Sequence, residues 1–490
     1  MENSVVFARK KFTMDKFLTQ AKLTAENPIK KVLSVSTRSN ISSSECANGM
    51  VSVGGKTFVN VVYLSADGSV ERTGAEVEFI EKQQTNYSLD NLFVCDEVSV
   101  ESQNFSSTEV MVTVSHKASV SGVYRYELAN FDGSENDFVM RKRSFDAMRQ
   151  VACVSDSFVV AEESESNIKN MKILQADAKA VVTQATCTLD KIIVEGKVLA
   201  EVFENDGESF GLVSKEFEFK QEVLAEGTVP SMLASADIAV KNITITPEEN
   251  EEKTNISYSF DLYVQASAFE ESTYEVVTDM FSLGNEITTT NDFIEAKNYH
   301  SQVVMSDTVM LTADVSNIEN FDDVVGVYGG TFTLTSAEDA GEKVKISGIV
   351  NTQALCKVGE GYEVLRTGNE NYFEISKDES VIFEGVNTAV EVLSFKVKAG
   401  KELEISARIT YTSKFNTMIS ESFVSGFESV KQKPENHGGI KVYVAHQGET
   451  LFDVAKALSV RPETIANQNE VSDIFEQGEK IYIYSPINLI

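Results

Sequence analysis

Tryptophan is absent from the sequence, and only 6 of the 490 residues are proline and only 5 are cysteine. The cysteines are odd in number, lie far apart and form no CxxC or Cys/His cluster, so neither a disulfide framework nor a zinc site is expected. They are Cys46, Cys95, Cys153, Cys187 and Cys356. The histidines also show no HExxH or other metal-ligand spacing. They are His116, His300, His437 and His446. We therefore expect reduced, mostly buried thiols, and no metal or other cofactor.

Positive charge and long apolar runs are also scarce. The chain has 43 Lys and Arg residues against 75 Asp and Glu residues, a net charge of −32. Binding to nucleic acid or to an anionic membrane needs a basic face that neutralises phosphates, so neither partner is expected. No apolar run approaches the ~18 residues of a membrane-spanning helix, and residues 1–20 contain no signal-peptide apolar core or cleavage site. We expect a soluble, cytoplasmic protein without membrane insertion.

Catalytic motifs are missing as well. There is no GxSxG, and no cysteine has a nearby histidine that could activate it. Gly55-Lys56-Thr57 looks like the end of a phosphate-binding loop, but its spacing from Gly49 is one residue too long. A strand is also expected to follow, where that loop needs a helix. The acidic run at 248–252 lacks the pattern of a calcium loop. The sequence favours a protein that is not an enzyme.

The residue types that are plentiful indicate β structure. Hydrophobic residues make up 42% of the chain. Valine, isoleucine, threonine, phenylalanine and tyrosine are common, as in strands that pack on a core. A length of 490 residues is too great for one core and predicts three or four domains.

One pattern occurs three times at a spacing of roughly 145 residues, which is too long for a solenoid repeat. Its anchors are Gly55, Gly196 and Gly348. Apolar residues alternate before each glycine, and about two dozen residues after it comes a phenylalanine, at Phe79, Phe219 or Phe373. This alternation predicts a long strand with the glycine at a bulge, where a side chain would not fit. Hairpin turns are predicted at Asp67-Gly68, Asp206-Gly207 and Gly359-Glu360-Gly361.

These features divide the chain into segments. The prediction is an N-terminal leader at 1–28, β modules at 29–160, 167–290 and 291–430, a polar linker at 431–440, and a C-terminal domain at 441–485. In the leader, Phe12, Phe17 and Leu18 are expected to form a short helix. Seams between the modules are expected at 162–166 and around 288–292, where polar residues gather. Residues 434–439 carry Pro and Gly and form the clearest linker.

The segment 441–484 predicts a strand, two helices and a second strand. An alternating run from Val442 to Ala445 fits the first strand. Thr450 and Asp453 fit a capping box, after which apolar residues recur at spacings of three and four. Pro462 suits the first position of the second helix, where a missing N–H costs nothing. Residues 480–484 alternate again and predict the closing strand.

This segment resembles a LysM domain. The matching positions are Tyr443, Gly448, Glu449, Thr450, Leu451, Val454, Ala455, Val460, Ile465, Asn469, Gly478 and Ile481. Two positions depart from the family pattern: Ser459 stands where a helix-ending glycine is usual, and Arg461 where a Ser or Thr cap is usual. Together these departures cost on the order of 1–2 kcal/mol, which the fold should survive.

The whole chain resembles the SipL group of spore-forming bacteria, in which tandem SPOCS modules precede one LysM domain. The resemblance implies a mainly β fold, with three tandem β-sandwich-like modules followed by a small βααβ LysM domain. It also implies a non-catalytic scaffold of spore-coat assembly in the mother-cell cytoplasm at the forespore surface, whose LysM domain docks on the coat's basement ATPase. The alternative is a cell-wall or spore-cortex protein whose LysM domain binds peptidoglycan through N-acetylglucosamine glycans.

Under both interpretations, the contact is expected in a groove of the LysM domain. The groove residues are Gln447, Gly448, Glu449, Thr450, Leu451, Phe452, Val471, Ile474 and Phe475. Phe452 lies off the apolar face of its helix, and Phe475 lies in the opposite loop. These two aromatic side chains are either partner contacts or part of the small core, and the sequence leaves both interpretations open. The lack of tryptophan and of an export signal favours a protein partner over a glycan.

Overall fold

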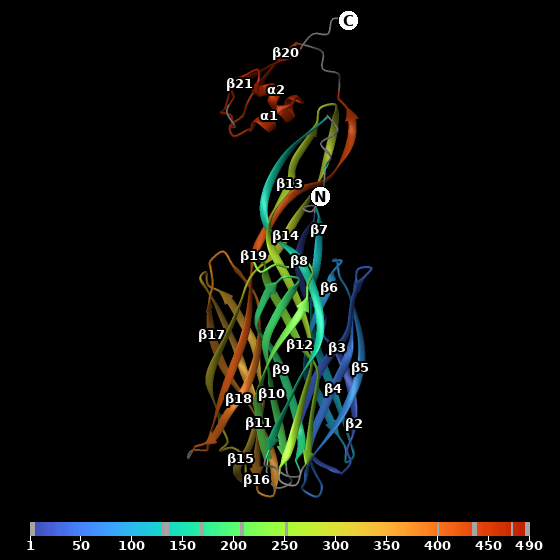
Figure 1. The fold of residues 1–490 in the computed structure, drawn as a ribbon, viewed down its shortest axis with the longest axis vertical. Coiled ribbons are helices and arrows are strands. Elements are labelled where there is room, and N and C mark those ends of the chain that lie inside the picture. Colours follow the sequence, from blue (N-terminus) through green and yellow to red (C-terminus); the bar gives the residue numbers. More distant parts are fainter. Residues whose placement is uncertain are drawn as a thin grey trace.

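The computed structural model describes residues 5–129, 131, 137–166, 171–205, 210–249, 253–398, 401–433, 439–471 and 474–485. In these residues the chain is mostly β, as the sequence predicts, and forms several small antiparallel sheets. Figure 1 shows an elongated molecule, with three groups of strands at one end and the C-terminal segment at the other.

The first group of strands, unit 1, includes the segment that was expected to be a leader. Its strands are β1 (Val5–Thr13), β2 (Phe17–Thr24), β3 (Ile29–Ala47), β4 (Met50–Ser65), β5 (Val70–Gln84), β6 (Asp90–Phe105) and β7 (Glu109–Glu127). The sheet β3-β4-β5 shares a buried core with the sheet of β1, β2, β6 and β7. The predicted short helix is wrong, because Thr19, Ala21 and Leu23 are buried in alternation with exposed residues. This period of two is that of a strand. β2 pairs with β7, as β1 does.

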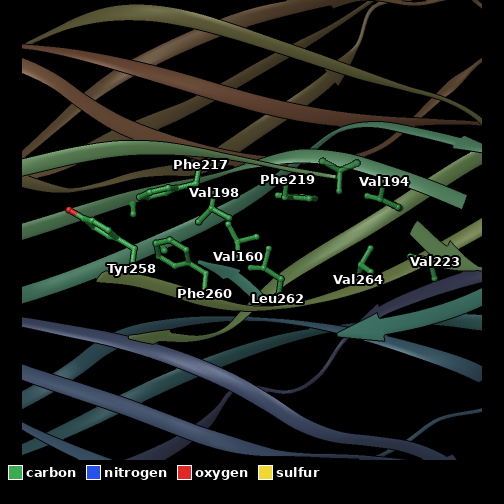
Figure 2. Packing of buried hydrophobic residues seen from close by; sticks show 14 of the residues in the cluster. Val160, Val194, Val198, Phe217, Phe219, Val223, Tyr258, Phe260, Leu262 and Val264 are labelled. Carbon is green, nitrogen blue, oxygen red and sulfur yellow. The ribbon is translucent and has the colours of Figure 1, made fainter. Parts of the chain in front are cut away.

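Units 2 and 3 repeat this plan with one long strand in place of β1 and β2. Unit 2 contains β8 (Phe138–Ser166), β9 (Lys172–Thr188), β10 (Lys191–Asn205), β11 (Phe210–Leu224), β12 (Leu233–Glu249) and β13 (Thr254–Ser282). Unit 3 contains β14 (Asn285–Asp314), β15 (Phe321–Asp339), β16 (Lys343–Val358), β17 (Gly361–Ser376), β18 (Ile382–Val397) and β19 (Glu402–Gln432). The sheet orders are β9-β10-β11 with β12-β13-β8, and β15-β16-β17 with β14-β19-β18. Figure 2 shows the core of unit 2, where the ring of Phe217 lies 5.1 Å from that of Tyr258 and 5.2 Å from that of Phe260.

The strand pairing places the borders between units differently from the sequence prediction. β8 pairs with β13 over its whole length and so belongs to unit 2, although most of its residues were assigned to the first module. The seams predicted at 162–166 and 288–292 lie inside the paired strands β8 and β14. Their polar side chains belong to long strands and not to linkers. The structure places the borders between β7 and β8 and between β13 and β14. Of the linker predicted at 431–440, residues 431–432 belong to β19 and residues 439–440 to β20. Residues 434–438 of this linker, and the turn predicted at 206–207, lie outside the described residues.

The three anchor glycines occupy equivalent places, and the expected bulge is confirmed. Gly55, Gly196 and Gly348 lie in the central strands β4, β10 and β16. Directly beside each glycine, the pairing with the preceding strand shifts register. A Cβ atom at Gly196 would overlap the carbonyl oxygen of Val181 and the ring of Phe219. The bulge therefore brings backbone so close that only glycine fits.

The aromatic side chain that contacts the anchor glycine comes from a different strand in the third repeat. In the first repeat, Phe79 of the following strand covers Gly55. In the third repeat, Phe373 pairs with Ile346, two residues from the anchor glycine, and Phe332 of the preceding strand fills the space. The predicted spacing thus identifies the strand and its glycine but not this contact.

The three units contact one another around a shared interior. Leu33, Phe203 and Tyr328, one from each unit, belong to one buried cluster. Elsewhere in this interior, one carboxylate oxygen of Asp237 lies 2.6 Å from Arg9 Nη2, and the other lies 2.6 Å from Lys414 Nζ. These three residues come from units 2, 1 and 3. Burial alone would raise the pKa of Asp237, but the Lys414 ammonium and the Arg9 guanidinium hold it well below its ordinary value.

A small polar cavity adjoins this ionic contact. Its volume is about 30 Å³, and Arg9, Lys414, Gln265 and Asn416 are among the residues that line it. That volume suits about one water molecule. Apolar packing and a buried three-way ion contact together fix how the units sit against one another.

The long strands of units 2 and 3 extend beyond their facing sheets. We call this extension the neck; it consists of 138–150 paired with 269–282 and 285–298 paired with 417–432. Tyr274, Ile294 and Phe423 belong to a buried cluster that holds the two ribbons together. In Figure 1 the neck separates the three units from the C-terminal segment.

Candidate interaction site at the C-terminal tip

Residues 439–485, which we call the tip, contain two strands and two short helices. The elements are β20 (Gly439–Val444), α1 (Leu451–Leu458), α2 (Pro462–Ala466) and β21 (Lys480–Ser485). β20 and β21 pair antiparallel. Ile481 and Ile483 of β21 share one buried cluster with Val454 of α1 and Ile465 of α2, so the helices cover one face of the strand pair. Among the residues of the tip that the structure describes, none covers the other face of this pair.

The start of α1 is set by the predicted capping box. The Asp453 N–H donates to Thr450 Oγ1 over 3.4 Å, and the Thr450 N–H donates to Asp453 Oδ2 over 2.9 Å. Burial alone would raise the pKa of Asp453, but hydrogen bonds from Thr450 and Arg141 hold it below its ordinary value. The charged carboxylate therefore stays at the helix N-terminus, where the helix dipole favours it.

The two departures from the family pattern have structural consequences. Ser459 ends α1 in the left-handed conformation with φ of 56°, a strained place for a residue other than glycine. Arg461 makes no side-chain cap, and Pro462 takes the first position of α2 as predicted. Lys433 Nζ, just after β19, donates to Ser459 Oγ over 2.9 Å. The strained end of α1 is thereby tied to the neck.

The two loops of the predicted groove are hydrogen-bonded to each other. The Gln447 N–H donates to Gln477 Oε1 over 3.1 Å, and the Gln477 N–H donates to Gln447 Oε1 over 3.3 Å. The Phe475 N–H donates to the Glu449 carbonyl over 2.8 Å, and the Gly448 N–H donates to the Phe475 carbonyl over 3.1 Å. The backbone turns at Gly448 with φ of 86°. The structure thus brings the residues of the predicted groove together but closes the space between the loops with hydrogen bonds.

The side chains of these loops differ in accessibility. Phe475 is 0% exposed and lies in the core of the tip, so the core interpretation describes it. Leu451 and Val471 are partly buried against the same cluster. Ile474, which bridges to Thr450, is exposed. Of the predicted apolar groove side chains, Ile474 is therefore the most open to a partner.

Phe452 is held by the neck, a contact that neither interpretation of the sequence included. Its ring centroid lies 5.3 Å from that of Phe281 of β13, and the Arg141 guanidinium of β8 lies 4.5 Å above its ring. Arg141 also donates to Thr450 Oγ1 over 2.7 Å and to Asp453 Oδ1 over 2.6 Å. One side chain of the neck thus covers the capping box and the aromatic residue beside it.

A second ion pair joins the same two parts. Lys456 of α1 lies 2.6 Å from Asp279 of β13. Asp279 stands directly opposite Arg141 in the strand pairing, and Phe281 follows on the same side of the strand. The sequence does not indicate these three neck residues, because an alternating strand pattern carries no signal for a contact some 309 residues away.

A buried histidine cluster in unit 1 resembles a catalytic arrangement only in its hydrogen bonds. His116 Nδ1 lies 2.7 Å from Asp96 Oδ2, and Nε2 lies 2.9 Å from Thr19 Oγ1 and 3.1 Å from Thr57 Oγ1. The ring of Phe17 stacks on the imidazole at 4.5 Å. All the polar side chains are buried between two sheets, so the cluster does not face solvent. Among the residues described, Asp96 Oδ1 has no hydrogen-bond partner.

Among the residues that the structure describes, no group of three or more His, Cys, Asp or Glu side chains could hold a metal ion. None of the helices described is long and apolar enough to cross a membrane.

The fold defines a class: a mostly β protein in which a strand plan recurs and a small helical tip follows a long neck. Residues 171–248 match the family described as SipL, SPOCS domain. The match spans β9, β10, β11 and nearly all of β12, that is, one whole sheet of unit 2 and an edge strand of the other. It supports a SipL-like family and a role related to sporulation. No curated protein matches the chain.

Proposed function

We propose that this protein is a non-catalytic scaffold of spore-coat assembly, with three sandwich-type SPOCS modules and a LysM domain at the tip. In this proposal it acts in the mother-cell cytoplasm at the forespore surface. The LysM domain docks on a protein partner, the basement ATPase of the coat. The family match in unit 2 and the recurrence of its strand plan in units 1 and 3 support the SPOCS part.

The observation that carries the docking role is the placement of the tip. The tip stands at the far end of the neck from the three units, where a partner can approach it (Figure 1). At the same time Arg141, Phe281 and Asp279 hold it against the neck. A small domain held in a defined orientation loses less freedom on binding than one on a flexible linker, which favours affinity.

The contact with the neck disfavours the alternative of a glycan-binding LysM domain. Phe452 is the aromatic side chain of the predicted groove that could stack on a sugar ring. Its ring is already covered by Arg141 and Phe281. A glycan would have to displace both side chains.

The test compares both ligands on the same protein. The full chain and a chain that ends at Lys433 are purified, and their binding to the coat basement ATPase is measured by biolayer interferometry. Sedimentation with purified peptidoglycan is run in parallel. We expect the full chain to bind the ATPase, the shortened chain to lose binding, and neither chain to sediment with peptidoglycan. Sedimentation of the full chain alone, without ATPase binding, would favour the glycan alternative.

A further inference from the structure

The tip has three sides that could take part in contacts, and two of them are already occupied. The side formed by α1 and the predicted groove faces the neck through Phe452 and Lys456. The second side, the outer edge of β21, is closed by side-chain amides. Asn469 accepts from the Tyr482 N–H and donates to the Tyr482 carbonyl, both over 2.8 Å. Gln468 does the same for Tyr484, over 2.7 and 3.2 Å.

These amide contacts also reveal the orientation of the β20 backbone. Because Tyr482 and Tyr484 direct their backbone groups away from β20, their antiparallel partners direct theirs away from β21. The partners are Val442 and Ile440. The described residues place only β21 beside β20, so the outward N–H and C=O groups of Val442 and Ile440 form an open strand edge. An open edge of this kind is a template for another strand.

The face of β20 and β21 that the helices leave uncovered is mostly apolar, with the exposed Lys480 at one end, opposite Val444. Its exposed apolar side chains are Ile440, Val442, Val444, Tyr482 and Tyr484. Their exposed fractions run from 39% for Tyr482 to 65% for Ile440. Contiguous apolar side chains beside a free edge form the two parts of a strand-addition site: backbone groups give affinity, and alternate side chains give specificity.

The charge of this ribbon differs from that of the chain. The only charged residues of β20 and β21 are Lys441 and Lys480, in a chain of net charge −32. Antiparallel pairing of two β20 edges centred on Lys441 would set Lys441 of one tip directly opposite Lys441 of the other, and pairing centred on Val442 would set these two side chains diagonally across the strand pair. Like charges facing each other across a strand pair are unfavourable. The charge complementarity therefore favours an occupant that carries carboxylates.

We infer that β20 binds an extended segment of the partner as an added β-strand, with apolar side chains at alternate positions on the uncovered face and a carboxylate at a position between them, toward Lys441. This inference rests on the proposed function for the identity of the partner. It assigns the contact to the edge of β20 and its apolar face, and not to the groove loops.

The test uses the full chain, with the coat basement ATPase as the probe, in biolayer interferometry. Val442→Pro removes one outward N–H, and proline is tolerated in an edge strand where that group faces solvent. Val442→Thr is the matched control, because it keeps the N–H and suits a strand. Lys441→Glu tests the charge, with the exposed Lys357→Glu of β16 as its control. We expect Val442→Pro to weaken binding at least ~30-fold and Lys441→Glu at least ~5-fold, with both controls within ~3-fold of the parent chain.

The outcomes separate this inference from the proposed function. If the parent chain binds and Val442→Pro and Lys441→Glu bind equally well, strand addition is overturned while the scaffold role stands. If the parent chain does not bind the ATPase, both fall. Sedimentation equilibrium that shows a dimer lost in Val442→Pro would assign the edge to a second copy instead. A chain ending at Ser485 that binds the ATPase ten times more tightly would assign the face to residues 486–490. Far-UV circular dichroism checks that Val442→Pro is folded, and Tyr482→Ser is the substitute if it is not.

Discussion

Ionic contacts join the units to one another and also join the tip to the neck, but the contact of Asp237 with Lys414 between the units is more deeply buried than the contact of Arg141 with Asp453 at the tip. The side chains of Asp237 and Lys414 are 11% and 10% exposed, while those of Arg141 and Asp453 are 37% and 36% exposed. Breaking a buried ion contact leaves a charge without solvent or partner, whereas an exposed pair contributes little. The comparison indicates that the three units form a permanent assembly and that the tip is attached by a small free energy.

The largest expected effect comes from breaking the buried contact. Asp237→Asn leaves Arg9 and Lys414 without the carboxylate that holds both, and Glu384 is the other acidic group near them. We expect the free energy of unfolding to fall by about 3–5 kcal/mol, measured by urea denaturation.

An exposed pair serves as the control for this variant. Lys191 and Glu222 lie 2.6 Å apart with side chains 42% and 56% exposed. Lys191→Gln should leave the free energy of unfolding almost unchanged, because solvent screens this pair. Equal losses in the two variants would contradict the distinction between buried and exposed contacts.

The second prediction concerns packing inside unit 2. Gly196→Val places side-chain atoms where the Val181 carbonyl and the Phe219 ring already lie. We expect a loss of about 3 kcal/mol, because backbone at a bulge moves less easily than a side chain. Gly426→Ala in β19 is the matched control, since a Cβ atom there meets no atom within 4 Å. Thermal unfolding of both variants checks this; an unchanged melting temperature for Gly196→Val would mean that the bulge can relax.

Local sequence patterns predicted those features that depend on neighbouring residues. The capping box of Thr450 and Asp453 and the glycine opposite a bulge follow from short-range rules. The same rules failed for Phe17 and Leu18, where a short helix was expected but the pairing with β7 imposes a strand. Tertiary pairing overrides such weak local preferences.

The candidate site shows the same limit. The sequence located the loops of the tip but could not place them against the neck. Arg141 is one of many arginine residues in strands, and nothing near it in sequence marks it as a partner of Phe452. The polar runs at 162–166 and 288–292 predict seams between modules, but they lie inside paired strands. Exposed positions of long strands have the same polar composition as linkers.

The third prediction tests a titrating contact between units 2 and 3. The Glu201 carboxylate accepts from the Gly329 and Val392 N–H groups, both over 3.1 Å, and burial raises its pKa from 4.5 to about 7. A carboxyl whose pKa is raised on folding stabilises the folded state fully below the unfolded value, and this contribution is lost as pH rises through the folded value. Between pH 5 and 8, we expect the parent chain to lose on the order of 2 kcal/mol relative to Glu201→Gln.

Urea denaturation at several pH values provides the measurement for Glu201. The two proteins should differ in slope between pH 5 and 8 and converge in slope above that range. Parallel curves would mean that Glu201 titrates at the same pH in the folded and unfolded chains.

The smallest expected effect is at the contact between the tip and the neck. Arg141→Ala removes the cation above the Phe452 ring and the hydrogen bonds to Thr450 and Asp453. The Arg141 and Asp453 side chains are 37% and 36% exposed. We therefore expect the free energy that holds the tip against the neck to fall by only about 1 kcal/mol, while the capping box and core of the tip persist. Hydrogen exchange should then rise roughly five-fold in α1 and in β13 near Phe281, as local opening becomes easier. The melting temperature of the three units should not change.

Arg125→Ala, which breaks an exposed pair with Asp90 in unit 1, is the control and should leave exchange at the tip unaltered. A cooperative loss of stability throughout the chain in Arg141→Ala would show that the tip and the units unfold as one, and that the contact at the neck is as permanent as the buried one.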